Sequence, residues 1–159
     1  MKKSLFVILA VVALCACGGK DSAPFNYRGL AFTMPVTQFV DSLQARGFAV
    51  DSAASDSGRT VVLSSQAAKY RVLAAYQGEQ LQIVQETYNL STNDSTRRMW
   101  QELRDGLEQE LGAWPDCPLL SDDHKVANFD AGDGLISVLL ENTYTPTLTV
   151  RYTKKAEQK

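Results

Sequence analysis

The sequence predicts an α+β domain in which one antiparallel sheet carries two helices packed on the same face. Two segments place apolar residues at helical spacing. Several others alternate apolar and polar residues and are joined by short turns containing glycine, which is typical of antiparallel strands. Because the helices and the sheet each have an apolar face to bury, two packed layers satisfy both.

The first predicted helix covers about residues 36–46. Phe39, Val40 and Leu43 recur near helical spacing. Thr37 is its candidate N-cap, and Gly47 is expected to end it.

The second predicted helix is the clearest element of the chain, and it ends at Gly112. Asp94 or Ser95 is its candidate N-cap. Polar residues surround one apolar stripe, the pattern of a helix that lies on a core. The stripe consists of Trp100, Leu103, Leu107 and Leu111.

The predicted strands fall before and after these two helices. A first strand covers residues 25–32 and bends at Gly29. The last covers residues 147–153, and its alternation points Leu148, Val150 and Tyr152 inward. The other strands are expected near residues 61–63, 70–76, 81–88, 125–130 and 134–141. This order is one strand followed by two units of a helix and three strands, which suggests a tandem helix-plus-three-strand repeat.

The N-terminus has the pattern of an export signal. Lys2 and Lys3 precede an apolar run shorter than the about 20 residues that span a bilayer. The segment Leu14-Cys15-Ala16-Cys17 resembles the lipobox of bacterial lipoproteins. The resemblance implies cleavage between Ala16 and Cys17 and attachment of diacylglycerol to Cys17. The alternatives are an ordinary secreted protein and an uncleaved membrane anchor.

Three segments are therefore expected: a lipoprotein signal peptide at 1–16, a lipidated cysteine with a flexible tether at 17–24, and a single α+β domain at 25–155. The expected location is the cell envelope, at the periplasmic face or the outer surface of the outer membrane. Loss of Lys2 and Lys3 changes the formal charge from −2 to −4. That acidity argues against nucleic acid as a partner. The expected partners are the bilayer, through acylated Cys17, and an envelope protein.

Parts of the mature chain resemble small lipoproteins of gut Bacteroidetes. The matching residues are Arg28 to Pro35, Phe39 to Leu43, Arg46-Gly47-Phe48, Trp100 to Gly112, Pro115 and Arg151-Tyr152. Those proteins are mostly of unknown function, so the resemblance implies a compartment and a fold more than an activity. The order of helices and strands is also similar to BamE-like and β-lactamase-inhibitor-like domains, which bind proteins through an exposed sheet face.

Cys117 is the one cysteine expected to keep a free thiol, because Cys15 leaves with the signal and Cys17 takes the lipid. Burial as a small apolar residue is the favoured interpretation. A reactive or intermolecularly paired thiol is the alternative. Pairing with His124, the only histidine, is disfavoured because Cys117 lies between two prolines.

Few other residues suggest a metal, cofactor or catalytic site. The acids Asp122, Asp123, Asp130 and Asp133 are close enough in sequence to consider a cation site. Their spacing matches no EF-hand loop, and turn chemistry explains those nearest Gly134. No Gly-x-Ser-x-Gly elbow or phosphate-binding glycine loop occurs. We therefore predict no metal, no cofactor and no catalytic residue.

Two weaker patterns concern the surface. Asp-Ser dipeptides resemble the Bacteroidetes O-glycosylation acceptor, with Ser22 and Ser52 in loops as the better candidates; turn and cap chemistry is the alternative explanation. A tyrosine-rich sheet face is a second candidate, although a core position is favoured because Tyr is a good strand former. The tyrosines are Tyr70, Tyr76, Tyr88, Tyr144 and Tyr152.

Together these features favour a membrane-anchored, non-enzymatic protein-binding or assembly module that uses a sheet face or edge. One alternative is a periplasmic domain that binds a small ligand or metal, including an enzyme, built on Cys117 or the acids. Another is an inhibitor or immunity-type protein with a single tight partner.

Overall fold

The computed structural model describes residues 24–65 and 67–156. Its helices are α1 (Val36–Ala45) and α2 (Asn93–Leu111). A small hairpin of β1 (Asn26–Tyr27) and β2 (Leu30–Ala31) precedes α1. The strands of the main sheet are β3 (Ala49–Val50), β4 (Thr60–Ser64), β5 (Tyr70–Gln77), β6 (Gln80–Tyr88), β7 (Asp116–Leu120), β8 (His124–Asp130), β9 (Gly134–Asn142) and β10 (Pro146–Lys154).

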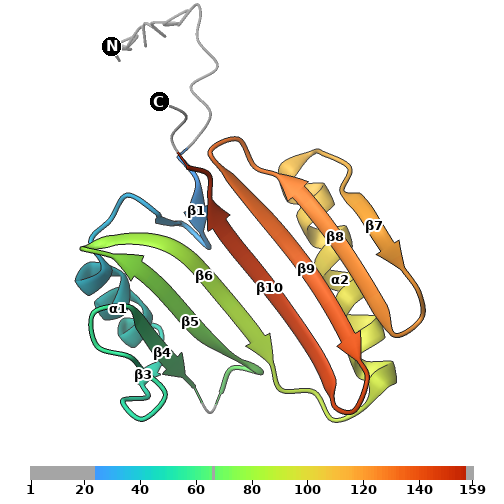
Figure 1. The fold of residues 1–159 in the computed structure, drawn as a ribbon, viewed down its shortest axis with the longest axis horizontal. Helices are drawn as coiled ribbons and strands as arrows, with labels where there is room; N and C mark the ends of the chain where they lie inside the picture. Colours follow the sequence, from blue (N-terminus) through green and yellow to red (C-terminus); the bar gives the residue numbers. More distant parts are fainter. Residues whose placement is uncertain (1–23, 66, 157–159) are drawn as a thin grey trace, which may run out of the picture.

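The main sheet is built from two similar halves. All its pairings are antiparallel, and the strand order is β3-β4-β5-β6-β10-β9-β8-β7 (Figure 1). In each half a helix is followed by four strands that run in sequence from the edge of the sheet to its centre, where β6 pairs with β10. The predicted α+β class is confirmed, but each unit contains four strands and not three.

The two strands missed by the sequence analysis are the edge strands. β3 has only two residues, which is too short for alternation to be seen. β7 contains Pro118 and shifts register along β8, so its apolar residues do not alternate cleanly. Both elements form because a neighbouring strand offers backbone partners, a long-range effect that local pattern does not record.

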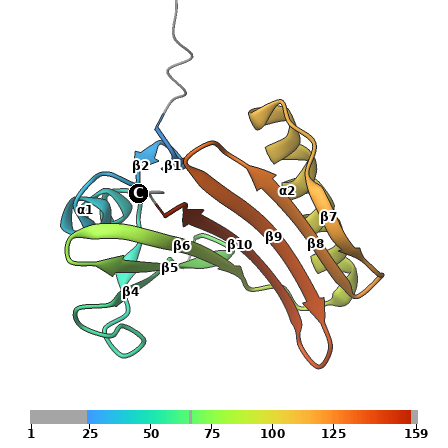
Figure 2. The same cartoon turned by 45° about the horizontal axis from the view of Figure 1, so that its top comes forward.

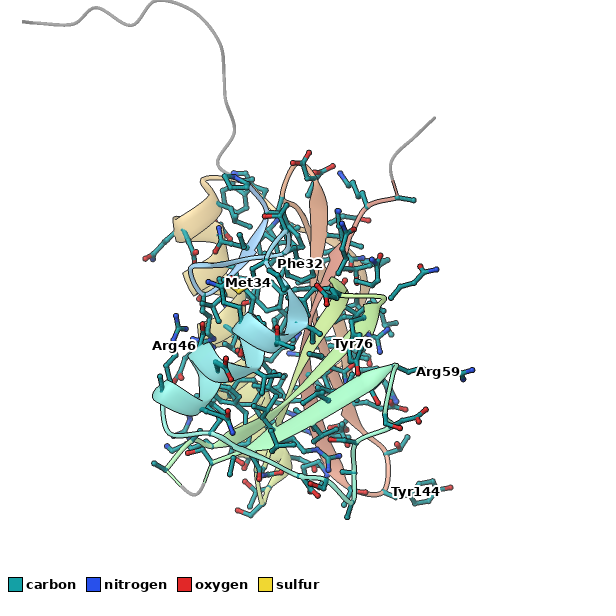
Figure 3. The ribbon with its side chains drawn as sticks, turned by 90° about the vertical axis from the view of Figure 1, so that its left-hand side faces the viewer. Phe32, Met34, Arg46, Arg59, Tyr76 and Tyr144 are labelled. Carbon is teal, nitrogen blue, oxygen red and sulfur yellow. The ribbon has the colours of Figure 1, made fainter. Side chains whose placement is uncertain are left out.

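Both helices lie on the same side of the main sheet, as Figures 2 and 3 show. The core fills the space between the two layers, and the β1–β2 hairpin contributes to it. On β10, Leu148, Val150 and Tyr152 are buried, which confirms their predicted inward direction. Trp100 of α2 is 1% exposed, and its indole N–H donates to the carbonyl of Val138 at 3.1 Å. The largest fully buried side chains are Trp100, Tyr27, Phe32, Phe39 and Phe129.

The helix caps differ from the predicted ones. Thr37 lies inside α1, and Pro35 precedes the helix without a side-chain cap. The N–H of Val36 instead donates to the carbonyl of Glu79, so the β5–β6 turn satisfies this end of the helix. In α2 the cap is Thr92, and Ser95 is the reciprocal member of a capping box. The candidate caps Thr37, Asp94 and Ser95 were therefore wrong by two or three positions.

The segment predicted as one bent strand is the β1–β2 hairpin. Arg28 and Gly29 both have positive φ, 48° and 83°, as a tight two-residue hairpin turn requires. The side-chain oxygen of Asn26 accepts from the N–H of Gly29 at 2.9 Å. The turn places Tyr27 and Arg28 over the middle of the main sheet.

Candidate functional site

The face of the main sheet that carries no helix is the first candidate surface, and we call it the open face. Side chains on β10 alternate between this face and the core. Those directed to the open face are Thr147, Thr149, Arg151 and Thr153. The predicted outward direction of Thr147, Thr149 and Arg151 is therefore confirmed.

Strand register brings residues from distant parts of the chain into one row on the open face. The row begins with three apolar side chains, of which Leu119 is 45% and Leu139 is 37% exposed. It continues through two threonines to an arginine. From β7 to β5 it reads Leu119, Val126, Leu139, Thr149, Thr87 and Arg71. This row thus changes from apolar at the β7 side to polar and cationic at the β5 side.

A second row runs beside the first and is centred on Arg151. The guanidinium of Arg151 donates to the amide oxygen of Gln85 at 3.0 and 2.8 Å. Within residues 24–65 and 67–156, Arg151 has no carboxylate within ion-pair distance. Asp116 lies in the same row at the far edge of the sheet. A cation without a counter-charge therefore stands near the middle of the open face.

The open face ends at β4 where the β3–β4 loop folds over it. Val62 of β4 is only 5% exposed although its register places it on this face. The hydroxyl of Ser55 accepts from the N–H of Val62 at 3.0 Å. The N–H of Tyr76 donates to the carbonyl of Arg59 at 2.9 Å, which holds the end of the loop against β5 (Figure 3).

The edges of the sheet are poor templates for another strand. β3 is two residues long, and β7 has a register shift and Pro118, which cannot donate a backbone hydrogen bond. The two alternatives of the sequence analysis, face or edge, are thus not equal, because both edges carry features that protect against pairing.

Exposed apolar side chains occur at both ends of β7: Trp114 precedes the strand, and Leu119 and Leu120 end it. Trp114 is 85% and Leu120 is 60% exposed. Of these residues, Leu119 belongs to the open face. Tyr144, fully exposed in the β9–β10 turn, points away from the sheet (Figure 3).

A buried acidic side chain, Glu86, lies on the covered side of the sheet. Its two carboxylate oxygens accept from the hydroxyls of Tyr27 at 2.8 Å and Tyr88 at 2.7 Å. They also accept from the Arg28 guanidinium at 2.5 and 3.1 Å. Glu86 is completely buried, whereas the Arg28 side chain is 43% exposed.

The surroundings of Glu86 fix the protonation of its partners. Burial, followed by the neighbouring Glu86 carboxylate, raises the pKa values of Tyr27 and Tyr88 well above 10.0. The hydrogen bond to Glu86 raises the pKa of Arg28, which keeps the guanidinium charged. Because all four donated bonds already occupy the carboxylate, this cluster attaches the hairpin to the sheet and offers no free acid or base.

Sequence reasoning did not select this cluster, although one signal was present. Glu86 stands at an inward position of a strand whose neighbours Val84 and Tyr88 are buried. A charged residue at such a position requires a partner. The hairpin that supplies the partner was predicted as one strand.

The candidate thiol pair is not assembled. In the β7–β8 register Asp116 is opposite Asn128, which places Cys117 near that end of β8. His124 begins β8, about four residues and thus roughly 13 Å away along the strand. Cys117 is half-buried and packs against the core, as an apolar residue would.

The candidate cation-binding acids are also separated. Asp123 and Asp130 lie at opposite ends of β8. Asp123 binds Arg97 at 2.6 Å, and Asp130 binds Lys155 at 2.8 Å; these contacts lower the pKa of each carboxyl. In the described part of the chain, no three His, Cys, Asp or Glu side chains converge on one point.

The remaining candidates divide between described and undescribed residues. Ala16, Cys17 and Ser22 lie outside the described residues. Ser52 is exposed in the β3–β4 loop, where the Asp51 carboxylate accepts from the N–H groups of Ala53 and Ala54. Tyr88 and Tyr152 are buried as favoured, and Tyr70 and Tyr76 are half-buried. Within the described ranges, neither helix is both long and apolar enough to cross a bilayer.

No protein family, curated protein or solved structure matches this chain.

Proposed function

We propose that this chain is an envelope lipoprotein, anchored by acylated Cys17 at the outer membrane, whose domain is a non-enzymatic protein-binding or assembly module. The anchor is supported by the N-terminal pattern from Lys2 to Cys17. The binding role is supported by one observation, the uncovered row from Leu119 to Arg71 across six strands. A face with this composition has no role in the core of the domain.

The composition of the open face suits a protein partner. Protein interfaces combine an apolar centre with hydrogen-bonding groups, and arginine is enriched in them. Here Leu119, Val126 and Leu139 supply the apolar contact. The threonines of β10 supply hydroxyl groups on rigid strands, so little side-chain freedom is lost on binding.

The charge of the open face specifies the partner further. Arg151 is held by Gln85 and lacks a carboxylate neighbour. A carboxylate on the partner, placed opposite Arg151 with an apolar side chain against Leu139, would complete both contacts. The partner is therefore a folded envelope protein with an acidic residue beside an apolar protrusion.

The sequence alternative of a site built on Cys117 or the acids has less support. The register of β7 and β8 separates the thiol from His124, and Asp123 and Asp130 each have a cationic partner. An inhibitor or immunity-type protein would use the same open face, and it differs in requiring one tight, equimolar partner.

The test is crosslinking in intact cells, followed by affinity capture of the lipoprotein and mass spectrometry. Wild type is compared with Leu139→Glu and Arg151→Glu on the open face. Gln109→Glu, at an exposed position of α2, adds one negative charge elsewhere, as Leu139→Glu does, and is the control for that variant.

We expect one stoichiometric partner that is retained by Gln109→Glu and lost in both open-face variants. Capture of the lipoprotein alone, or a partner lost equally in all three variants, would contradict binding through this face.

A further inference from the structure

A groove lies on the covered side of the domain, on the opposite side of the main sheet from the open face. It lies between α2 and the β1–β2 hairpin, with β9 and β10 as its floor, and has a volume of about 800 Å³. In Figure 1, β1 and α2 lie on either side of β9 and β10. This volume is within the range of small-molecule sites.

Apolar side chains from α2, the β1–β2 hairpin and β10 line the interior of the groove, together with polar surface of similar extent. One wall is the apolar stripe of α2, where Leu107 is 8% exposed and Leu103 and Leu111 are half-buried. Phe25 forms the opposite wall, and Tyr152 lies in the floor. The stripe was predicted to lie on the core; its outer leucines instead remain partly open to this groove.

The rim of the groove is acidic. Glu102 and Glu110 line it from α2, two turns apart and about 12 Å along the helix axis. Within the described ranges neither makes an ion pair, whereas Asp130 and Arg28, which also line the groove, are already paired with Lys155 and Glu86. Two carboxylates therefore remain without counter-charges beside an apolar surface.

Gly106 borders the groove on the α2 wall. It lies midway between Glu102 and Glu110, where glycine weakens a helix relative to alanine. A Cβ atom at this position would meet no atom within 4 Å, so packing within the domain does not require glycine. Its lack of a side chain keeps this wall of the groove open.

We propose that the groove binds a cationic amphiphile, a hydrocarbon chain with an amine head group. The chain lies along Leu103, Leu107 and Leu111 beneath Gly106, and the ammonium pairs with Glu102 or Glu110. Apolar side chains beside two unpaired carboxylates favour this charge over a neutral or anionic chain. Pro24, where the tether enters the domain, also lines the groove, so the membrane is the source of the ligand if the proposed anchor is correct.

The test uses decylammonium and decanoate, which share an apolar chain length and carry opposite charges. The protein is the chain from residue 17 with Cys17→Ser, which includes every described residue and needs no detergent. Calorimetric titration measures the affinity of the protein for each ligand at neutral pH, with both ligands well below their micellar concentrations. Because the Cys17→Ser protein carries no lipid and the titration contains no protein partner, the result does not depend on the proposed membrane anchor or on partner binding by the open face.

The matched variants are Glu102→Gln/Glu110→Gln at the rim and Glu79→Gln/Glu141→Gln at exposed positions elsewhere, which change the net charge equally. We expect one decylammonium site and roughly tenfold weaker binding of decanoate, the effect of two partly exposed charges. The rim variant should bind decylammonium more weakly by a similar factor, and the control variant should bind it as tightly as wild type does.

Two substitutions of Gly106 test the space directly. Gly106→Leu should abolish binding by placing a side chain over the groove, whereas Gly106→Ala should bind as wild type and confirm that the helix tolerates substitution. No decylammonium binding, equal affinity for decanoate, or equal loss in the rim and control pairs would overturn the proposal.

Discussion

The two faces of the main sheet treat their polar groups in different ways. On the covered face, Glu86 is buried and fully hydrogen-bonded by Tyr27, Arg28 and Tyr88. On the open face, Arg151 contacts one amide oxygen and otherwise faces solvent. In the described chain every buried side-chain polar atom has a partner. The buried polar groups of the covered face are therefore satisfied within the domain, whereas the guanidinium of Arg151 on the open face retains donors for another molecule.

This difference teaches that stability and recognition are separated by strand alternation. Along β10 the residues facing α2 are apolar and buried, and their neighbours are threonines and an arginine on the other face. A substitution on one face should therefore affect folding, and a substitution one residue away should affect binding. The predictions below depend on that separation.

The largest effect is expected for Trp100→Ala on the covered face. The indole is buried and hydrogen-bonded to Val138, so its removal should lower the free energy of unfolding by about 3–5 kcal/mol. Urea unfolding measures this, with Leu139→Ala on the open face as the comparison, expected below about 1 kcal/mol. Equal losses would show that both faces contribute to the core.

The next effect concerns the Glu86 cluster. Arg28→Met leaves the buried carboxylate without its counter-charge and should lower the free energy of unfolding by about 1–3 kcal/mol. The double variant Arg28→Met/Glu86→Gln should be more stable than Arg28→Met alone, because no charge is then buried and the amide oxygen still accepts a hydrogen bond from a tyrosine hydroxyl. A double variant that loses the sum of both single effects would argue against an electrostatic origin.

Alkaline pH should produce a smaller and gradual effect. Burial raises the pKa values of Tyr27, Tyr88 and Tyr152 above 10.0 in the folded chain, so the unfolded chain loses these protons first. The stability that these three tyrosines contribute is therefore fully present below pH 10 and is lost as the pH rises further. Urea midpoints should fall above pH 10, less steeply in Tyr27→Phe. Tyr144→Phe is the control and should show the same fall of the urea midpoint with pH as wild type. The same fall in Tyr27→Phe would contradict this account.

The smallest effect on stability is expected for Thr149→Glu at the centre of the open face. Its side chain does not enter the core, so the free energy of unfolding should change by no more than about 0.5 kcal/mol. Partner capture should nevertheless be lost. Strong destabilisation with normal capture would reverse the assignment of the two faces.

Much of the fold followed from local patterns, because both helices have clear apolar stripes and the six long strands lie near visible turns. Alternation also placed Leu148 and Tyr152 inward. The edge strands could not be predicted in the same way, since β3 and β7 depend on backbone partners that are distant in sequence. The Arg28-Gly29 turn was mistaken for a bend because arginine is uncommon at positive φ.

The candidate surfaces were less accessible to sequence reasoning. The row from Leu119 to Arg71 combines residues from six strands, and only strand order and register bring them together. Conversely, Asp123 and Asp130 are close in sequence, but an extended strand separates them. Sequence proximity was therefore a poor guide to sites in a sheet protein with this topology.

The most direct test of the central claim is site-specific photocrosslinking in intact cells. A photoreactive amino acid is placed at position 139 on the open face or at position 109 on the outer side of α2. The account predicts a crosslinked complex of one defined mass from position 139 and none from position 109. Crosslinks from position 109 alone, or none from either position, would contradict a binding role for the open face.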